Sequence, residues 1–101
     1  MDITIEKKNR EITAKLAGRL DTPASLEAAK TLDPLKEEAD KKIILDCTEL
    51  SYISSSGLRI FLSLRKAAAE KGGNVIIRGI NNDIRSVFMM TGFLNLFQIE
   101  D

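Results

Sequence analysis

The sequence of 101 residues contains no histidine, no tryptophan and only one cysteine, and its 15 Lys+Arg balance its 15 Asp+Glu. Without histidine, the chain lacks the usual base for a serine or cysteine nucleophile and the commonest metal ligand. Zero net charge, one tyrosine and four phenylalanines leave little of the attraction and stacking on which nucleic-acid binding depends. We therefore expect no enzyme, no metal or cofactor site and no direct contact with nucleic acid.

The single cysteine, Cys47, follows the apolar run of residues 43–45, so we expect a reduced thiol that packs in the interior. No basic segment followed by an apolar stretch opens the sequence, and no stretch approaches the ~18 apolar residues of a membrane span. We expect a cytoplasmic protein that is neither exported nor inserted into a membrane. The length fits one domain, residues 1–101, which is large enough to bury a core.

Hydrophobic periodicity predicts the strands. Residues 3–6 and 12–16 alternate between apolar and polar, which is typical of two half-buried strands, and the polar residues 7–10 suit a hairpin between them. The segments 42–47 and 74–78 are instead continuously apolar at their centres, as in parallel strands covered on both faces. A short last strand is expected at 96–100.

Capping residues predict the helices. Thr22 as N-cap and Pro23 as the first helical residue mark the start of the first helix, which Pro34 kinks or restarts. Two further helices are expected at 55–71 and 82–91, each stopped by glycine. The apolar residues of the first helix recur at helical spacing: Leu26, Ala29 and Leu32.

This order of elements predicts a single small α/β domain. An N-terminal β-hairpin leads into a mainly parallel sheet, with right-handed crossovers and helices packed chiefly on one face. In such sheets function gathers at the carboxyl ends of the strands. Three segments follow strands at that edge: residues 20–22, 54–57 and 81–83.

The serine triplet before the second helix has two interpretations. Serine is a preferred N-cap, so capping alone explains a serine there. Yet one cap is enough: if Ser54 or Ser55 caps the helix, the hydroxyl of Ser56 is left uncommitted. A helical wheel places Ser56 at the start of one polar face, which comprises Ser56, Arg59, Ser63, Lys66 and Glu70.

Two further expectations concern helix faces. Arg65 falls within the apolar arc of the second helix, so we expect its stem on the surface and its head in water. Met89 and Met90 are expected in the core and at the rim of the third helix.

Several segments together resemble a known family. Three segments look like the signature of STAS domains, specifically the bacterial anti-sigma factor antagonists. They are Ile43-Ile44-Leu45-Asp46, Leu50 and Ile53-Ser54-Ser55-Ser56-Gly57-Leu58-Arg59. Gly18-Arg19-Leu20-Asp21 resembles the other family motif, and Thr91-Gly92-Phe93 with Leu96-Phe97 fits the C-terminal part. The resemblance spans nearly the whole chain. In typical members a partner kinase, itself the anti-sigma factor, phosphorylates the serine immediately before the glycine, which is Ser56 here.

The resemblance implies a regulatory mechanism. The unphosphorylated protein would bind an anti-sigma factor serine kinase and release a sigma factor, and phosphorylation of Ser56 would end the binding until a serine phosphatase reverses it. Gly57 is expected to admit a partner backbone and Leu58 to supply an apolar contact. Asp21 has a second interpretation, as a residue that stabilises a helix start. The implied partner-binding residues are Asp21, Thr22, Ser54, Ser55, Ser56, Gly57, Leu58 and Arg59.

Two features depart from the family pattern. Ser54 stands where the family usually has Asp, and the sequence ends at Asp101, where many relatives add a helix. We expect a patch that is exposed or used in self-association, in a monomer or weak homodimer. The alternative function is an accessory STAS subunit of a lipid-transporting ABC system, or another STAS interaction module without a phosphoserine cycle. An enzyme is the least favoured class, because no base accompanies the serines.

Overall fold

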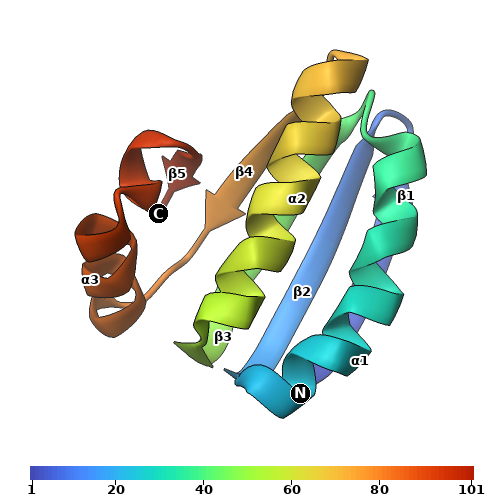
Figure 1. Cartoon of the computed structure of the whole chain (residues 1–101). Coiled ribbons are helices and arrows are strands. Elements are labelled where there is room, and N and C mark those ends of the chain that lie inside the picture. Colours follow the sequence, from blue (N-terminus) through green and yellow to red (C-terminus); the bar gives the residue numbers. More distant parts are fainter.

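The computed structural model describes all residues, 1–101, as a five-stranded sheet with helices packed against it (Figure 1). The strands are β1 (Asp2–Lys8), β2 (Glu11–Leu20), β3 (Lys42–Ile53), β4 (Asn74–Arg78) and β5 (Gln98–Glu100). The α-helices are α1 (Thr22–Leu32), α2 (Ser55–Lys71) and α3 (Asn82–Thr91), and Asp33–Glu38 and Phe93–Asn95 form short 3₁₀ helices. The predicted order of strands and helices is confirmed.

The sheet combines one hairpin with parallel strands. β1 pairs antiparallel to β2, and the turn between them places Asn9 at a φ of 38°, a region that asparagine tolerates better than most residues. β2, β3, β4 and β5 then lie parallel and side by side in chain order. The predicted hairpin and mainly parallel sheet are therefore confirmed.

Strand order decides where the helices lie. Each α-helix connects one parallel strand to its immediate neighbour on the same side, so right-handed crossovers place all three on one face. Figure 1 shows α1 and α2 side by side across this face. The main core lies beneath them and includes Ile43, Leu45 and Phe61. Phe88, Phe93 and Phe97 pack together under α3, with ring centroids 5.9–6.2 Å apart.

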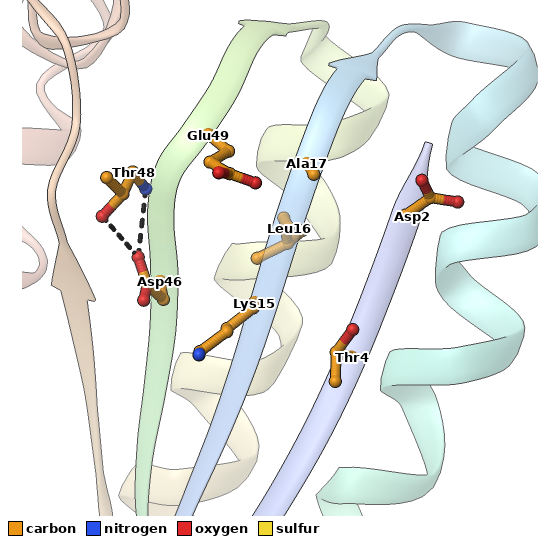
Figure 2. A pocket seen from close by; sticks show the side chains of 8 residues that line it. All are labelled: Asp2, Thr4, Lys15, Leu16, Ala17, Asp46, Thr48 and Glu49. Atoms are coloured by element: carbon orange, nitrogen blue, oxygen red, sulfur yellow. Dashed lines mark hydrogen bonds between the residues drawn. The ribbon is translucent and has the colours of Figure 1, made fainter.

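The opposite face of the sheet carries no helix, as Figure 2 shows for β1, β2 and β3, where α1 and α2 lie behind the strands. Its side chains alternate with the core-facing ones along each strand. Ile44 and Ile76 lie at its centre and are only 0% and 2% exposed. The expectation that these strands are buried on both faces is met at these residues, although helices cover only one face. We call this surface the helix-free face; its residues include Asp2, Thr4, Glu6, Glu11, Thr13, Lys15, Lys42, Ile44, Asp46, Asn74, Ile76, Arg78, Gln98 and Glu100.

Four local expectations are wrong. Asp21, not Thr22, is the N-cap of α1. β5 begins at Gln98 rather than at residue 96, because a 3₁₀ turn precedes it. Arg65 donates a hydrogen bond from Nε to the carbonyl of Leu96 instead of releasing its head to water. The side chains of α3 expected at the core and rim are both exposed: Met89 and Met90.

Candidate functional site: the groove between α1 and α2

The start of α2 gives each serine of the triplet a different environment. Ser54 is the N-cap: its Oγ accepts a hydrogen bond from the amide of Gly57 at 3.2 Å. Only 8% of Ser54 is exposed, and its Oγ lies 3.4 Å from Oγ of Ser25 in α1. Ser54 is therefore a structural residue, and its burial removes it from the predicted partner-binding surface.

Ser55 and Ser56 are not needed for the cap. Ser55 is exposed and Ser56 is half-buried, and neither hydroxyl has a hydrogen-bond partner in the protein, whereas that of Ser54 does. Their amides belong to the first turn of α2, where backbone N–H groups have no partner within the helix. The first turn thus presents a free hydroxyl at Ser56 beside unpaired amide donors.

A groove runs between the N-terminal parts of α1 and α2, and Ser56 lies on its wall. Arg59, one turn further along α2, lines the same groove. Leu26 of α1 also lines the groove and is 71% exposed. The groove is lined by Thr22, Pro23, Ser25, Leu26, Ala29, Ser56, Arg59 and Ile60.

Hydrogen bonds hold the two helix starts in fixed positions. Asp21 Oδ1 accepts from the amide of Ala24 at 2.9 Å, and the Asp21 carbonyl accepts from Ser25 Oγ at 2.8 Å. The carbonyl of Leu20 accepts from the amide of Ser54 at 2.8 Å. The ends of β2 and β3 are therefore tied to both helices, and of the two interpretations of Asp21, the capping role is the one observed.

Gly57 and Leu58 do not reach a partner as expected. Leu58 is 6% exposed and belongs to the core. A Cβ on Gly57 would lie 2.8 Å from Cγ and Cδ2 of Leu20 and 2.9 Å from Cγ1 of Ile53. Glycine is required there because α2 packs tightly on the strand ends, not because a partner backbone approaches. The predicted residues that remain accessible, at least in part, are Asp21, Thr22, Ser55, Ser56 and Arg59.

Sequence reasoning missed the apolar side of the groove. It placed Leu26 at helical spacing with Ala29 and Leu32 and gave it no role in a groove, whereas α1 buries Ser25, Ala28 and Leu32. These buried residues have equally good helical spacing, and the buried hydroxyl of Ser25 is held by the Asp21 carbonyl. The third segment at the sheet edge does not join the groove: Asn81 caps α3, accepting from the amide of Ile84 at 2.8 Å and donating to the carbonyl of Leu50.

A second hollow lies on the helix-free face between β1, β2 and β3 (Figure 2). Within it, Asp46 Oδ1 accepts hydrogen bonds from the hydroxyl and amide of Thr48 at 2.6 and 3.1 Å. Partial burial raises the pKa of Asp46, but these hydrogen bonds and the charges of Arg78 and Lys15 outweigh it, so the pKa lies below its usual value. Asp46 is therefore a stably charged member of this face.

Cys47 belongs to the core and lines neither of these two hollows. Burial raises the pKa of the Cys47 thiol to about 12, so the thiol stays protonated and unreactive. The acidic and sulfur side chains form no cluster that could hold a metal ion. None of the helices has the length and apolar character needed to cross a membrane. The groove presents two hydroxyls that have no hydrogen-bond partner in the protein, those of Thr22 and Ser56.

Comparison with known proteins supplies the family. The family model described as the STAS domain matches residues 2–101. BtrV of Bordetella bronchiseptica, which is provisionally named an anti-sigma factor antagonist, is 27% identical over 99 residues, 98% of this chain and 85% of BtrV. The anti-sigma-B factor antagonist of Staphylococcus aureus is 25% identical over 103 residues, with 100% of this chain and 95% of the relative covered.

Solved structures show the same fold. The anti-sigma factor antagonist SpoIIAA in its unphosphorylated form aligns with a TM-score of 0.77 at 20% identity, over 99% of this chain and 88% of SpoIIAA. The phosphorylated form of the Bacillus protein aligns with a TM-score of 0.74 at 21% identity, over 97% and 90% of the two chains. The predicted fold is thereby confirmed.

Proposed function

Because the chain belongs to the STAS domain family, we propose that it is an anti-sigma factor antagonist that binds its anti-sigma factor through the groove between α1 and α2. Relatives that cover nearly the whole chain carry that function in their names. The observation that carries the proposal is the unbonded hydroxyl of Ser56 on the wall of a groove that the exposed Leu26 also lines. A protein-binding site is typically an apolar patch rimmed by polar groups, and in the groove Pro23, Leu26, Ala29 and Ile60 lie beside Thr22, Ser56 and Arg59.

Phosphorylation of Ser56 would switch this binding off without unfolding the protein. A phosphate carries about −1.5 to −2 charges, and at the first turn of α2 the helix dipole and free amides stabilise an anion by roughly 0.3–2 kcal/mol. Arg59 lies one turn away on the same groove wall and adds a compensating charge. The free energy of unfolding should therefore stay the same or rise.

In the interface with the partner, the phosphate on Ser56 is instead unfavourable. A partner that covers the groove must strip water from the phosphate, which costs several kcal/mol unless a cation replaces that water. A cost of ~4 kcal/mol corresponds to about a thousandfold loss of affinity. SpoIIAA exists in phosphorylated and unphosphorylated forms with this fold. By analogy, the partner is an anti-sigma factor that is itself the serine kinase, and a serine phosphatase restores the binding form.

The test compares the binding of three variants to the anti-sigma factor kinase of the same genome by titration calorimetry. Ser56→Ala should bind like the wild type, and Ser56→Asp should bind at least tenfold more weakly. Ser55→Asp is the matched control: it adds the same charge one residue away, outside the groove. Incubation of the wild type with the kinase and ATP should place phosphate on Ser56.

Three outcomes would contradict the proposal. Equal affinity of Ser56→Ala and Ser56→Asp would refute the charge switch. Phosphate found only on Ser55 would show that the groove is not the regulated site. Absence of any binding by the folded wild type would favour the accessory-subunit alternative, which needs no kinase.

A further inference from the structure

The helix-free face carries a row of charges that alternate in sign from strand to strand. Lys15 of β2 pairs in register with Asp46 of β3, Asp46 with Arg78 of β4, and Arg78 with Glu100 of β5. Figure 2 shows Lys15 and Asp46 on the side of the sheet away from α1 and α2. The residues that flank Arg78 and Glu100 along their strands, Ile77 and Ile99, pack on the core, so these two also project from the helix-free face.

Over the four parallel strands, a second row, two residues earlier along each strand, is uncharged; on β1 it continues to Glu6, whose carboxylate lies 3.8 Å from Lys15. Thr13 pairs with Ile44, Ile44 with Ile76, and Ile76 with Gln98. The apolar residues thus occupy the two central strands of this row, and polar residues flank them. Both rows are centred on the line between β3 and β4.

We propose that the helix-free face binds a second copy of this chain across a two-fold axis that runs parallel to the strands, between β3 and β4. This rotation places β3 opposite β4 of the second copy and β2 opposite its β5. Asp46 then faces Arg78 of the second copy, and Lys15 faces its Glu100, so every charge of the row meets its opposite. In the second row, Ile44 lies opposite Ile76, but both are already covered within each copy, at 0% and 2% exposed, so the charged row carries the contact.

Two-fold axes placed elsewhere on this face pair fewer of the charges. An axis between β2 and β3 would set Lys15 against Asp46 but Arg78 against Thr4, and would leave Glu100 without a partner. An axis centred on β3 would oppose Asp46 with its own copy and Lys15 with Arg78. An axis across the strands would set every strand on itself, with the same result for Asp46. The pattern of charge therefore favours the axis between β3 and β4, because this axis pairs all four charges of the row.

The geometry and size of the face indicate a weak dimer. Packed sheets lie ~10 Å apart and cross at roughly 30°, which offsets β2 from β5 of the second copy by roughly 4 Å, within reach of long Lys and Glu side chains. About a dozen residues per copy is fewer than the 20–30 of a stable interface. The Arg78–Glu100 pair, 2.8 Å apart and 36% and 41% exposed, keeps part of its water, so the association should weaken in salt.

Dimerisation would leave the groove free. The groove lies between α1 and α2, on the other side of the sheet from the helix-free face (Figures 1 and 2). Both copies could therefore bind a partner, and self-association does not depend on what that partner is.

The test uses sedimentation equilibrium of the full chain at concentrations up to millimolar and at low salt. The wild type should show a monomer–dimer equilibrium that high salt weakens. Asp46→Arg alone and Arg78→Asp alone should each lose at least about tenfold in self-affinity, because each reversal recurs twice in a two-fold interface. Mixed together, the two variants should form a heterodimer, because two positive positions then face two negative ones.

The controls keep the result interpretable. Lys66→Glu reverses an exposed charge on α2, away from the helix-free face, and should leave the association unchanged. Thermal melts verify that each variant is folded; if either charge reversal fails to fold, Lys15→Glu mixed with Glu100→Lys makes the same test at the outer positions. A wild type that stays monomeric at low salt, or a folded mixture that does not associate, would overturn the proposal.

Discussion

Replacing the three serines of the α2 start with alanine, one at a time, should give sharply different stabilities. Ser54→Ala removes the oxygen that accepts from the Gly57 amide at 3.2 Å. Loss of a serine cap costs roughly 0.5–2 kcal/mol, and the burial of the Gly57 amide places this cap near the upper end, because no water can replace the lost acceptor. Ser25 keeps its hydrogen bond to the Asp21 carbonyl, so the substitution leaves no second polar group without a hydrogen-bond partner. We expect a loss of about 1.5–2 kcal/mol.

Ser55→Ala and Ser56→Ala should change the free energy of unfolding by no more than ~0.5 kcal/mol, because neither hydroxyl has a partner and alanine is the better helix former. Urea unfolding measures all three variants, and in a domain of this size the Ser54→Ala loss should lower Tm by roughly 6–15 °C. If Ser56→Ala is as destabilised as Ser54→Ala, then Ser56 holds the cap, and the free hydroxyl on which the proposed switch depends does not exist.

Two further predictions test the core and the helix-free face. Gly57→Ala should destabilise the protein by roughly 1–2 kcal/mol in urea unfolding, because crowding against Leu20 outweighs the gain in helix propensity of ~1 kcal/mol; an unchanged or higher stability would show that α2 is not wedged on the strand ends. The pKa of Asp46 lies below its usual value, so its charge stabilises the fold above the unfolded pKa of ~3.9, and this contribution disappears as the pH falls through the lowered folded pKa. Asp46→Asn should therefore be less stable than the wild type at pH ~6 and approach it in acid, in unfolding curves measured at protein concentrations too low for association; a constant difference would contradict this assignment.

Element boundaries were predictable wherever a single residue enforces them. Gly72 and Gly92 end α2 and α3 at φ values of 81° and 79°, which other residues rarely adopt. The start of β5 carries no such signal. The apolar pair Leu96 and Phe97 reads as strand, but Phe97 is drawn into the phenylalanine cluster under α3 while Leu96 stays exposed. The start of β5 is therefore set by tertiary packing and not by the local sequence pattern.

The candidate site was only partly predictable, because helical spacing identifies a face but not which face is buried. In α1 two stripes, one through Leu26 and one through Ser25, fit the helical period equally well. The buried stripe is the one with Ser25, whose hydroxyl donates a hydrogen bond to the Asp21 carbonyl. In α3, Ile84 and Phe88 fill the available space and leave the methionines outside. Nearby residues in α2 differ in the same way, since Leu58 is buried whereas Ser56, two residues earlier, is only half-buried.

The same topological rule accounts for both proposed surfaces. Parallel strands added in chain order, each through a right-handed crossover, must place every helix on one face. Two neighbouring helices that start at the carboxyl ends of adjacent strands then form a groove there, and the opposite face is left to side chains alone. That face carries a row of charges instead of an apolar patch: Lys15, Asp46, Arg78 and Glu100. Such a row limits non-specific aggregation and selects a register. Rigid packing separates the groove from the row, so partner binding and self-association can change independently.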